Sequence, residues 1–242
     1  MKFGFIVLIF FSLSFNAFSQ DKNPFQLPVE ADTLSVYDEK YREDQFYISI
    51  TYNLLGNKPN NVTQSGFSTG YHIGFIRDMP INKRRNLALG LGFGLSSNSY
   101  NSTLLISESN SNYTYSVIDE NQINFDKNKF TTYLIEFPLE FRWRTSTIAD
   151  YNFWRIYTGF KVGYVVHNTS KFVSSSGDIR LSKIDDLNRF QYGLTFSAGY
   201  ANISFHAYYG LNPIFNSDAI VEETGEAVDM NAIKIGLMFY IL

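Results

Sequence analysis

Residues 86–97, NLALGLGFGLSS, decide the fold, because large apolar side chains alternate strictly with small ones. The large residues are Leu87, Leu89, Leu91, Phe93 and Leu95. Side chains of a strand alternate between the two faces of a sheet, so this stretch has one apolar face and one almost bare face. In a helix, each glycine would cost about 1 kcal/mol and the leucines would be scattered around the circumference. The stretch therefore predicts a β-strand.

The same alternation recurs along most of the chain. The expected strands are residues 46–54, 67–75, 87–95, 132–143, 155–166, 190–200, 203–211 and 233–241. Alternation sustained over so many segments is a much stronger signal than any single segment. We therefore expect an all-β fold, an eight-stranded antiparallel up-and-down transmembrane β-barrel.

The lengths of the connections alternate as well. The long links are residues 56–65, 98–130, 169–188 and 212–230, and the short links are residues 79–86, residues 145–153 and a tight turn around Ala201. Outer-membrane barrels have short periplasmic turns and longer extracellular loops. This parity predicts that both ends of the barrel domain lie on the periplasmic side.

The first residues have the order of a secretory signal. Lys2 precedes an apolar run, and Ala17-Phe18-Ser19 provides small residues before Gln20. We expect a signal peptide over residues 1–19, a polar periplasmic leader over 20–45 and a barrel over 46–242. The chain has no cysteine, which excludes disulfides, thiolate metal sites, thiol catalysis and a lipidated N-terminal cysteine. The net charge is -3, so the chain lacks the excess of basic residues that is typical of nucleic-acid-binding proteins.

A barrel with this pattern could place its apolar face outward against lipid or inward around a ligand, as in a secreted lipocalin-like binder. The less apolar face is mostly Gly, Ser, Thr and Tyr, which suits a narrow lumen better than a surface in water. We therefore expect a barrel in the cell outer membrane, in contact with outer-membrane lipid. The residues expected to face lipid are Leu87, Leu89, Leu91, Phe93, Leu95, Ile135, Phe137 and Leu139.

Charged residues on the inward face form a second pattern. These residues are Glu136, Glu140, Arg142, Arg155 and Lys161. A hairpin folded about residue 149 would bring Glu136 level with Lys161 and Glu140 within diagonal reach of Arg155. Paired carboxylates could serve as a glycosidase acid and nucleophile. Because buried charges must be paired, we expect an ion-pair network in the lumen instead.

Candidate catalytic and ligand residues are sparse. His72, His167 and His206 have no companion at ligand spacing on their own strands, so we expect no metal site. Ser204 and His206 share one face and would suit an outer-membrane lipid deacylase, but two residues apart on a strand means only a common face. No glycine-rich phosphate loop precedes a helix. We assign no catalytic residue and no cofactor.

Two segments are candidates for binding a protein partner. Residues 98–130 are rich in Ser and Asn and include Tyr113 and Tyr115, a mixture that recognition surfaces favour. The leader, residues 20–45, carries many acidic side chains, and Lys83, Arg84 and Arg85 on a short turn could contact them or anionic lipid.

The run Tyr133-Leu134-Ile135-Glu136-Phe137-Pro138-Leu139-Glu140-Phe141 resembles the YLEIPL signature of the PorT-like, porin-family outer-membrane β-barrels. The resemblance implies an eight-stranded barrel in the outer membrane and, for PorT itself, a role in type IX secretion. It supplies no catalytic residue. We therefore expect a non-enzymatic protein, an anchor that displays extracellular loops or an accessory subunit of an envelope assembly. The alternatives are a lipid-modifying enzyme, a narrow solute pore and the secreted binder.

Overall fold

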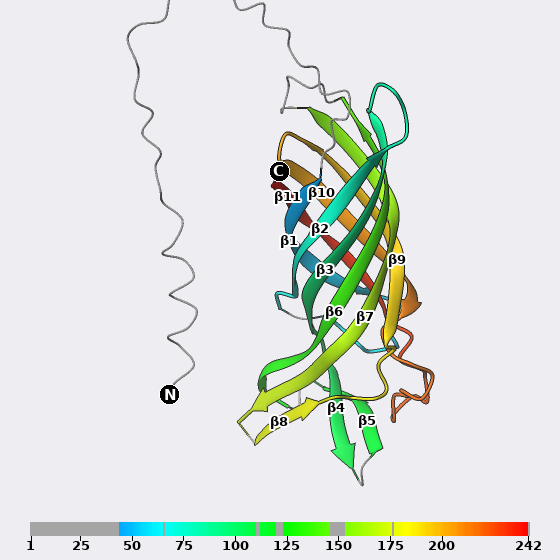
Figure 1. Ribbon diagram of the computed structural model, residues 1–242. Coiled ribbons are helices and arrows are strands. Elements are labelled where there is room, and N and C mark those ends of the chain that lie inside the picture. The colour runs from blue at the N-terminus through cyan, green and yellow to red at the C-terminus, as the bar shows by residue number, and fades with distance from the viewer. Residues whose placement is uncertain are drawn as a thin grey trace, which may run out of the picture. The chain divides into compact units, whose positions relative to one another are not determined.

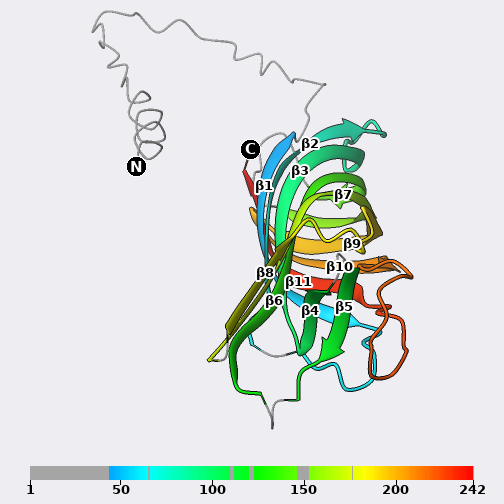
Figure 2. The same ribbon diagram turned by 90° about the horizontal axis from the view of Figure 1, so that it is seen from below.

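The computed structural model describes residues 44–64, 66–109, 112–119, 123–145, 153–175 and 177–241 (Figures 1 and 2). The expected signal peptide and nearly all of the expected leader lie outside the described residues. None of the described residues forms a helix long and apolar enough to cross a membrane.

Eight antiparallel strands of the described chain form one closed barrel. They are β1 (Gln45–Gly56), β2 (Thr69–Pro80), β3 (Leu87–Asn101), β6 (Phe125–Arg144), β7 (Trp154–Ser174), β9 (Phe190–Tyr200), β10 (Ile203–Pro213) and β11 (Asn231–Ile241). The sheet runs β6-β3-β2-β1-β11-β10-β9-β7, and β6 also pairs with β7, which closes it. The eight strands are those that the alternation predicts, so the expected fold class is confirmed.

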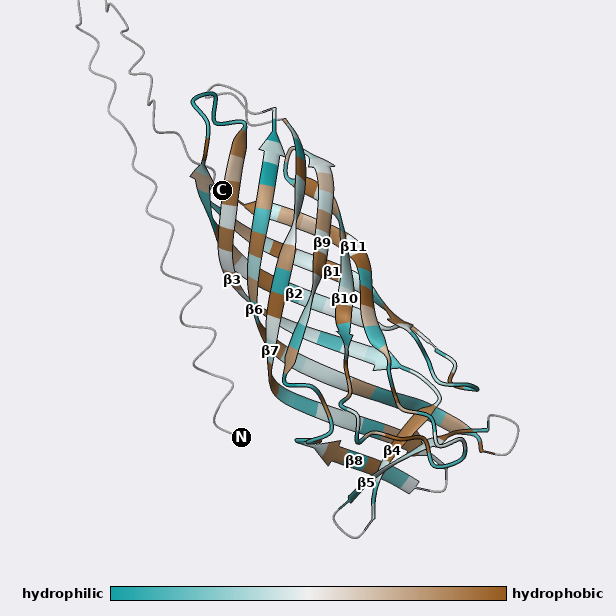
Figure 3. Cartoon of the chain, turned by 90° about the vertical axis from the view of Figure 1, so that its right-hand side faces the viewer, coloured by the Kyte–Doolittle hydropathy of each residue, from teal (hydrophilic) through white to brown (hydrophobic). Residues whose placement is uncertain are grey.

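The two faces of each strand have opposite surroundings. On β3, Leu91 is 55% exposed and Phe93 50% exposed, whereas Ala88 is fully buried. Leu91 lies directly opposite Leu139 of β6, which is 49% exposed. Figure 3 shows the resulting alternation of apolar and polar residues along the strands. The large apolar side chains therefore cover the outside of the barrel.

The glycines of β3 face a crowded interior. A Cβ atom on Gly90 would lie 2.9 Å from Nε of Arg142, and one on Gly92 would lie 2.7 Å from Cγ1 of Ile76. A Cβ atom on Gly94 would meet the hydroxyl of Tyr47. Small residues are therefore needed here because side chains from other strands already occupy the space.

One end of the barrel carries elements that the sequence pattern misses. The predicted loop 98–130 contains a hairpin of β4 (Leu104–Ser109) and β5 (Asn112–Val117), and the predicted loop 169–188 contains β8 (Gly177–Ser182), which pairs with β7. The ends of β3, β6 and β7 also continue beyond their predicted limits, and β7 has 21 residues. Figure 1 shows β4, β5 and β8 together at the end opposite the C-terminus.

These elements cover the end of the lumen with a hydrophobic cluster, which we call the cap. Phe130 of β6 packs edge-on against Phe215 at 5.3 Å between ring centroids, and Tyr115 of β5 packs on the same ring at 5.7 Å. The other buried members are Leu55, Val62, Tyr100, Leu104, Ile106, Ile184, Leu187, Tyr208, Ile214, Ala219, Val221, Val228, Met230 and Ala232. The loops and the ends of the barrel strands thus bury one apolar cluster together.

The opposite end has the shorter connections. Residues 81–86 join β2 to β3, and Ala201 and Asn202 alone join β9 to β10. The lumen near this end is filled by a second cluster, Tyr47, Ile76, Tyr157, Met238 and Tyr240. This is the end that the sequence predicts to be periplasmic, because short turns are periplasmic in outer-membrane barrels, and we call it the periplasmic end; the cap lies at the opposite end.

Candidate functional site

The middle of the lumen is organised around the carboxylate of Glu136. Nζ of Lys161 lies 3.1 Å from its Oε2, and Oγ of Ser96 donates to its Oε1 at 2.9 Å. Nδ1 of His72 lies 3.2 Å from both carboxylate oxygens. Four strands therefore contribute to one polar cluster, and Glu136 itself is 1% exposed.

The pairing of β6 with β7 differs from the expected register. Lys161 lies opposite Pro138, and Glu136 lies opposite Gly163, so Glu136 reaches Lys161 diagonally rather than level with it. Because side chains repeat with a period of two, a two-residue shift keeps every residue on its predicted face and changes only its neighbours. The prediction that Glu136 and Lys161 lie level is therefore wrong in register, although the two groups do meet.

A second charged cluster lies toward the periplasmic end. Arg142 lies 3.1 Å from both Asp78 and Glu140, and Arg144 lies 2.8 Å from Asp78. Gln45 accepts a further hydrogen bond from Arg142 at 3.0 Å. Asp78 and Arg144 lie at the ends of β2 and β6, outside the strand limits that the alternation predicts. Extending the alternation of β2 and β6 by a few residues would have placed both in the lumen.

Arg155 is the exception among the predicted network residues. It lies opposite Arg144 instead of within reach of Glu140, so that expected pair is wrong. Its guanidinium lies 4.6 Å from the ring of Phe153 and 5.1 Å from that of Tyr240, and it is fully buried. Among the described residues it has no hydrogen-bond partner. Its stabilising contacts are therefore the two aromatic faces.

The histidines are dispersed. Nδ1 of His206 lies 2.7 Å from Oγ of Ser197, not from Ser204, whose hydroxyl has no partner among the described residues. His206 and Ser197 are each 2% exposed. His167 lies on the outer wall, where its ring stacks on Tyr133 at 5.7 Å, because the β6–β7 pairing shifts register between Tyr133 and Leu134. No group of three or more metal-ligating side chains occurs in the described part of the chain.

The predicted lipid-facing residues all lie on the outer face. Leu89, Leu91, Phe93, Leu95, Phe137 and Leu139 are each between 40% and 55% exposed, and Leu87 and Ile135 are partly exposed. They form part of a band that continues around the barrel.

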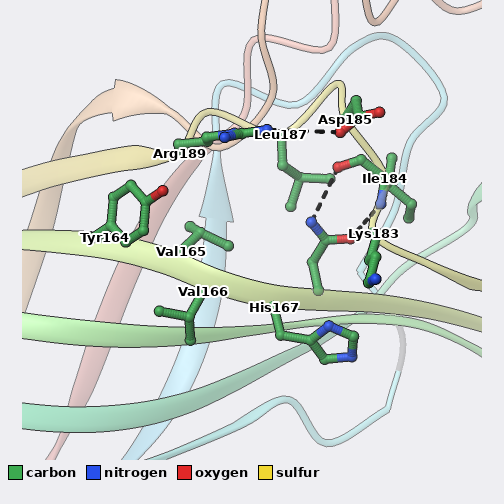
Figure 4. Close-up of a pocket in the computed structure, with 10 residues that line it drawn as sticks. Tyr164, Val165, Val166, His167, Lys183, Ile184, Asp185, Leu187 and Arg189 are labelled. Atoms are coloured by element: carbon green, nitrogen blue, oxygen red, sulfur yellow. Dashed lines mark hydrogen bonds and ion pairs between the residues drawn. The ribbon is translucent and has the colours of Figure 1, made fainter.

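Two cavities lie at the cap end. One has a volume of about 330 Å³ and is lined in part by Tyr164, Val166, Lys183 and Arg189 (Figure 4). It forms where β7 exchanges its partner β9 for β8: Tyr164 pairs with Phe190, but Thr169 pairs with Ser182. A second cavity of about 460 Å³ lies between the loops, lined by residues that include Thr103, Ile118 and Glu223.

Comparison with solved structures gives only weak similarity. Two variants of the porin of Rhodopseudomonas blastica, at 9% and 8% identity, and a structure described as "Asymmetric conductivity of engineered proteins", at 8%, each align with 83% of this chain and 100% of their own, with a TM-score of 0.21. A TM-score this low supports no argument about fold or function. No curated protein matches the chain.

The family comparison is decisive. The family model described as "Outer membrane protein beta-barrel domain" matches residues 18–216, which cover most of the chain and seven of the eight barrel strands. The closed barrel, its apolar outer band and its polar, filled lumen agree with that match. The chain therefore belongs to the outer membrane protein beta-barrel domain family, and its location is the outer membrane.

Proposed function

We propose that this protein is a non-conducting, non-enzymatic membrane anchor that holds an ordered extracellular cap as a binding surface for a protein partner. The observation that carries the proposal is the cap. The loops pack buried side chains onto residues at the ends of the barrel strands, and the β4–β5 hairpin contributes Leu104, Ile106 and Tyr115 to this cluster. Binding residues are often placed on loops that a rigid scaffold positions.

The filled lumen supports an anchor over a narrow solute pore. Arg142 is fully buried, and Tyr47 and Glu136 are each 1% exposed, at successive levels of the barrel. An eight-stranded barrel has room only for side chains in its interior. Passage of a solute would require these side chains and the cap to move.

The position of the serine and histidine side chains supports a non-enzymatic role. Ser197 and His206 are the hydrogen-bonded pair, and both are buried in the lumen, where neither lipid nor an extracellular substrate reaches them. Ser204 and His206, the pair suggested by the sequence, do not bond to each other in the described structure.

An accessory role in a larger envelope assembly is the specific form of this proposal. The resemblance of residues 133–141 to the PorT-like signature suggests type IX secretion as the assembly. Two segments would make the contacts, the leader at residues 20–45 on the periplasmic side and the loop 98–130 on the outside. The apolar band, including Leu91 and Leu139, would hold the protein in lipid.

The proposal is tested by cross-linking in intact cells of the producing organism, followed by purification of the barrel in detergent. Three forms are compared: the native chain, a chain with residues 104–117 replaced by a short Gly-Ser linker, and a chain lacking residues 21–43. We expect a stoichiometric partner that the chain with the replaced hairpin loses, and a loss in the chain lacking residues 21–43 as well would show that the leader also contacts it. A native barrel that yields no partner, or a partner that the chain with the replaced hairpin retains, contradicts the proposal.

Conductance provides an independent measurement. The native protein in a planar bilayer should show no single-channel current. Regular current steps from the native protein would support the solute pore instead.

A further inference from the structure

Three cationic residues lie side by side across the outer ends of three strands. Lys129 of β6 pairs directly with Lys171 of β7, and Lys171 pairs directly with Arg180 of β8. Directly opposed residues in an antiparallel pair lie on the same face, with Cβ atoms about 5 Å apart. We call Lys129, Lys171 and Arg180 the basic stripe.

The basic stripe lies on the outside of the barrel wall. The neighbouring residues Phe130 and Phe172 are buried at 2% and 7% exposure, and Phe130 belongs to the cap. Because successive side chains of a strand point to opposite faces, Lys129 and Lys171 point away from the cap. Arg180 is exposed, with its side chain 67% accessible.

The height of the stripe on the wall is defined by the residues beneath it. The aromatic pair Tyr133 and His167 lies on the same outer face. Above it the wall turns polar, where Ser99 and Thr131 share a hydrogen bond of 2.8 Å. Lys129 lies four residues beyond Tyr133, which corresponds to about 13 Å along a strand. Aromatic residues mark the membrane interface, so the stripe lies at the level of the outer headgroups.

Opposed like charges destabilise a sheet, so their alignment here is costly unless an anion is bound. The pKa of Lys129 is lowered, first because it is partly buried and then because Lys127 and Lys171 repel its charge. The nearby acidic partner is Asp178, which lies 3.2 Å from Arg180 on the exposed surface. Asp178 and Asp126, which is next to Lys127 on β6, are two carboxylates against four cations, Lys127, Lys129, Lys171 and Arg180.

The cavity of about 330 Å³ is lined on β7 by residues 164–168, and Lys171 of the stripe follows three residues later on the same strand. Figure 4 shows Lys183 and Arg189 on the segment that borders it, with Tyr164 and Val166 on β7. Arg189 has Asp185 at 4.0 Å, and both are largely exposed. Cationic groups above and apolar groups below match the order of headgroup and acyl chain in a lipid.

We infer that the basic stripe and the adjacent cavity form a binding site for a phosphorylated glycolipid of the outer leaflet, whose phosphates lie against Lys129, Lys171 and Arg180. Charge complementarity and position at the headgroup level favour this ligand. The inference depends on the outer-membrane location and not on which partner the cap binds.

The test uses the full chain in detergent and native mass spectrometry with added bis-phosphorylated lipid A. The variant is Lys129→Gln/Lys171→Gln/Arg180→Gln. The matched control is a pair of double variants: Lys58→Gln/Arg77→Gln removes two charges from exposed residues elsewhere, and Lys171→Gln/Arg180→Gln removes two charges from the stripe. Each cation near an anionic lipid surface contributes enough that loss of three should weaken binding roughly 100-fold. Of the two double variants, only Lys171→Gln/Arg180→Gln should bind less tightly than the native chain.

Two further arms keep the result interpretable. Lipid A stripped of its phosphates should bind the native chain as weakly as intact lipid A binds the variant, and raising the salt concentration should weaken binding of intact lipid A. If the triple variant does not fold, Arg180→Gln alone should still weaken binding several-fold, because that side chain is exposed. Equal binding by the native chain and the folded variant, equal binding of dephosphorylated lipid A, or equal binding of phosphatidylglycerol overturns the inference.

Discussion

The hydroxyl of Tyr47 occupies the space that a methyl group on Gly94 would need, although the two residues lie on β1 and β3 with β2 between them. Gly94→Ala should therefore destabilise the barrel by about 1–3 kcal/mol, the usual cost of overpacking. The hydroxyl of Tyr47 has no hydrogen-bond partner among the described residues, so Tyr47→Phe should cost little. In the Tyr47→Phe background, Gly94→Ala should cost less than it does alone. Urea unfolding in liposomes, followed by the fluorescence of Trp143 and Trp154, measures the coupling. If the effects of Tyr47→Phe and Gly94→Ala on the free energy of unfolding simply add, the predicted contact between the two residues is wrong.

The contact between Glu136 and Lys161 predicts a second coupling. Lys161→Met leaves the buried carboxylate with hydrogen bonds to His72 and Ser96 and with the charge of Lys234 nearby, and loss of one member of a buried pair costs about 3–5 kcal/mol. Adding Glu136→Leu should recover part of that loss, because the unpaired charge is then removed as well. The same unfolding measurement applies. A double variant that is less stable than the sum of the single variants predicts would argue against the pair.

Removing the charge of Arg155 and removing the charge of Arg142 should have different effects on the free energy of unfolding. Arg155 is buried without a hydrogen-bond partner among the described residues, so Arg155→Met should leave the free energy of unfolding unchanged or raise it. Arg142 bonds to Asp78 and Glu140, so Arg142→Met should lower it by about 3–5 kcal/mol. Equal destabilisation by the two substitutions would show that Arg155 has a partner of comparable strength.

Leu91 should be sensitive to charge because it lies in the apolar band opposite Leu139, although Arg77 lies opposite it on β2. Leu91→Arg should cost about 2–4 kcal/mol if that site is near the bilayer midplane, whereas Ser99→Arg, above the aromatic level on the same strand face, should cost about 0–1 kcal/mol. Unfolding from thin-bilayer liposomes measures both. A larger cost for Ser99→Arg would place the membrane at a different height on the barrel.

Tyr115 should make the stability of the cap decrease at alkaline pH. Burial, and then the hydrogen bond to Asp186 at 2.9 Å, raise the pKa of its phenol above the ordinary value of 10.0. The folded cap therefore favours the neutral phenol, so this stabilisation is complete below pH 10 and decreases as the pH rises above it. Protease cleavage of the cap should accelerate above pH 10, and Tyr115→Phe should reduce that acceleration. If cleavage of Tyr115→Phe accelerates above pH 10 as much as cleavage of the native chain does, another titrating group causes the acceleration.

The barrel wall could be predicted from the sequence because a period of two is a local signal. Leu91 and Gly92 need no knowledge of distant strands to be assigned to opposite faces. The pairing of Glu136 with Lys161 was harder, because the register of β6 and β7 depends on the turn between them, and a shift of two residues leaves the pattern unchanged.

The cap could not be predicted in the same way. Its strands β4, β5 and β8 are six residues each, and their apolar residues are few and separated by Ser and Asn. Phe215 and Tyr115 meet across a hundred residues of sequence, a contact that no local pattern contains. His206 shares a strand face with Ser204, but its hydrogen-bond partner Ser197 lies directly opposite it on β9, a neighbour that the pattern of one strand does not reveal.

The 21 residues of β7 are longer than a bilayer requires. At about 3.3 Å per residue and a tilt of about 40°, such a strand rises about 50 Å, twice the roughly 25 Å of an outer-membrane apolar band. The surplus length holds the β4–β5 hairpin and the rest of the cap beyond the acyl chains of the bilayer. A soluble protein too bulky to approach the membrane surface could therefore still touch this barrel.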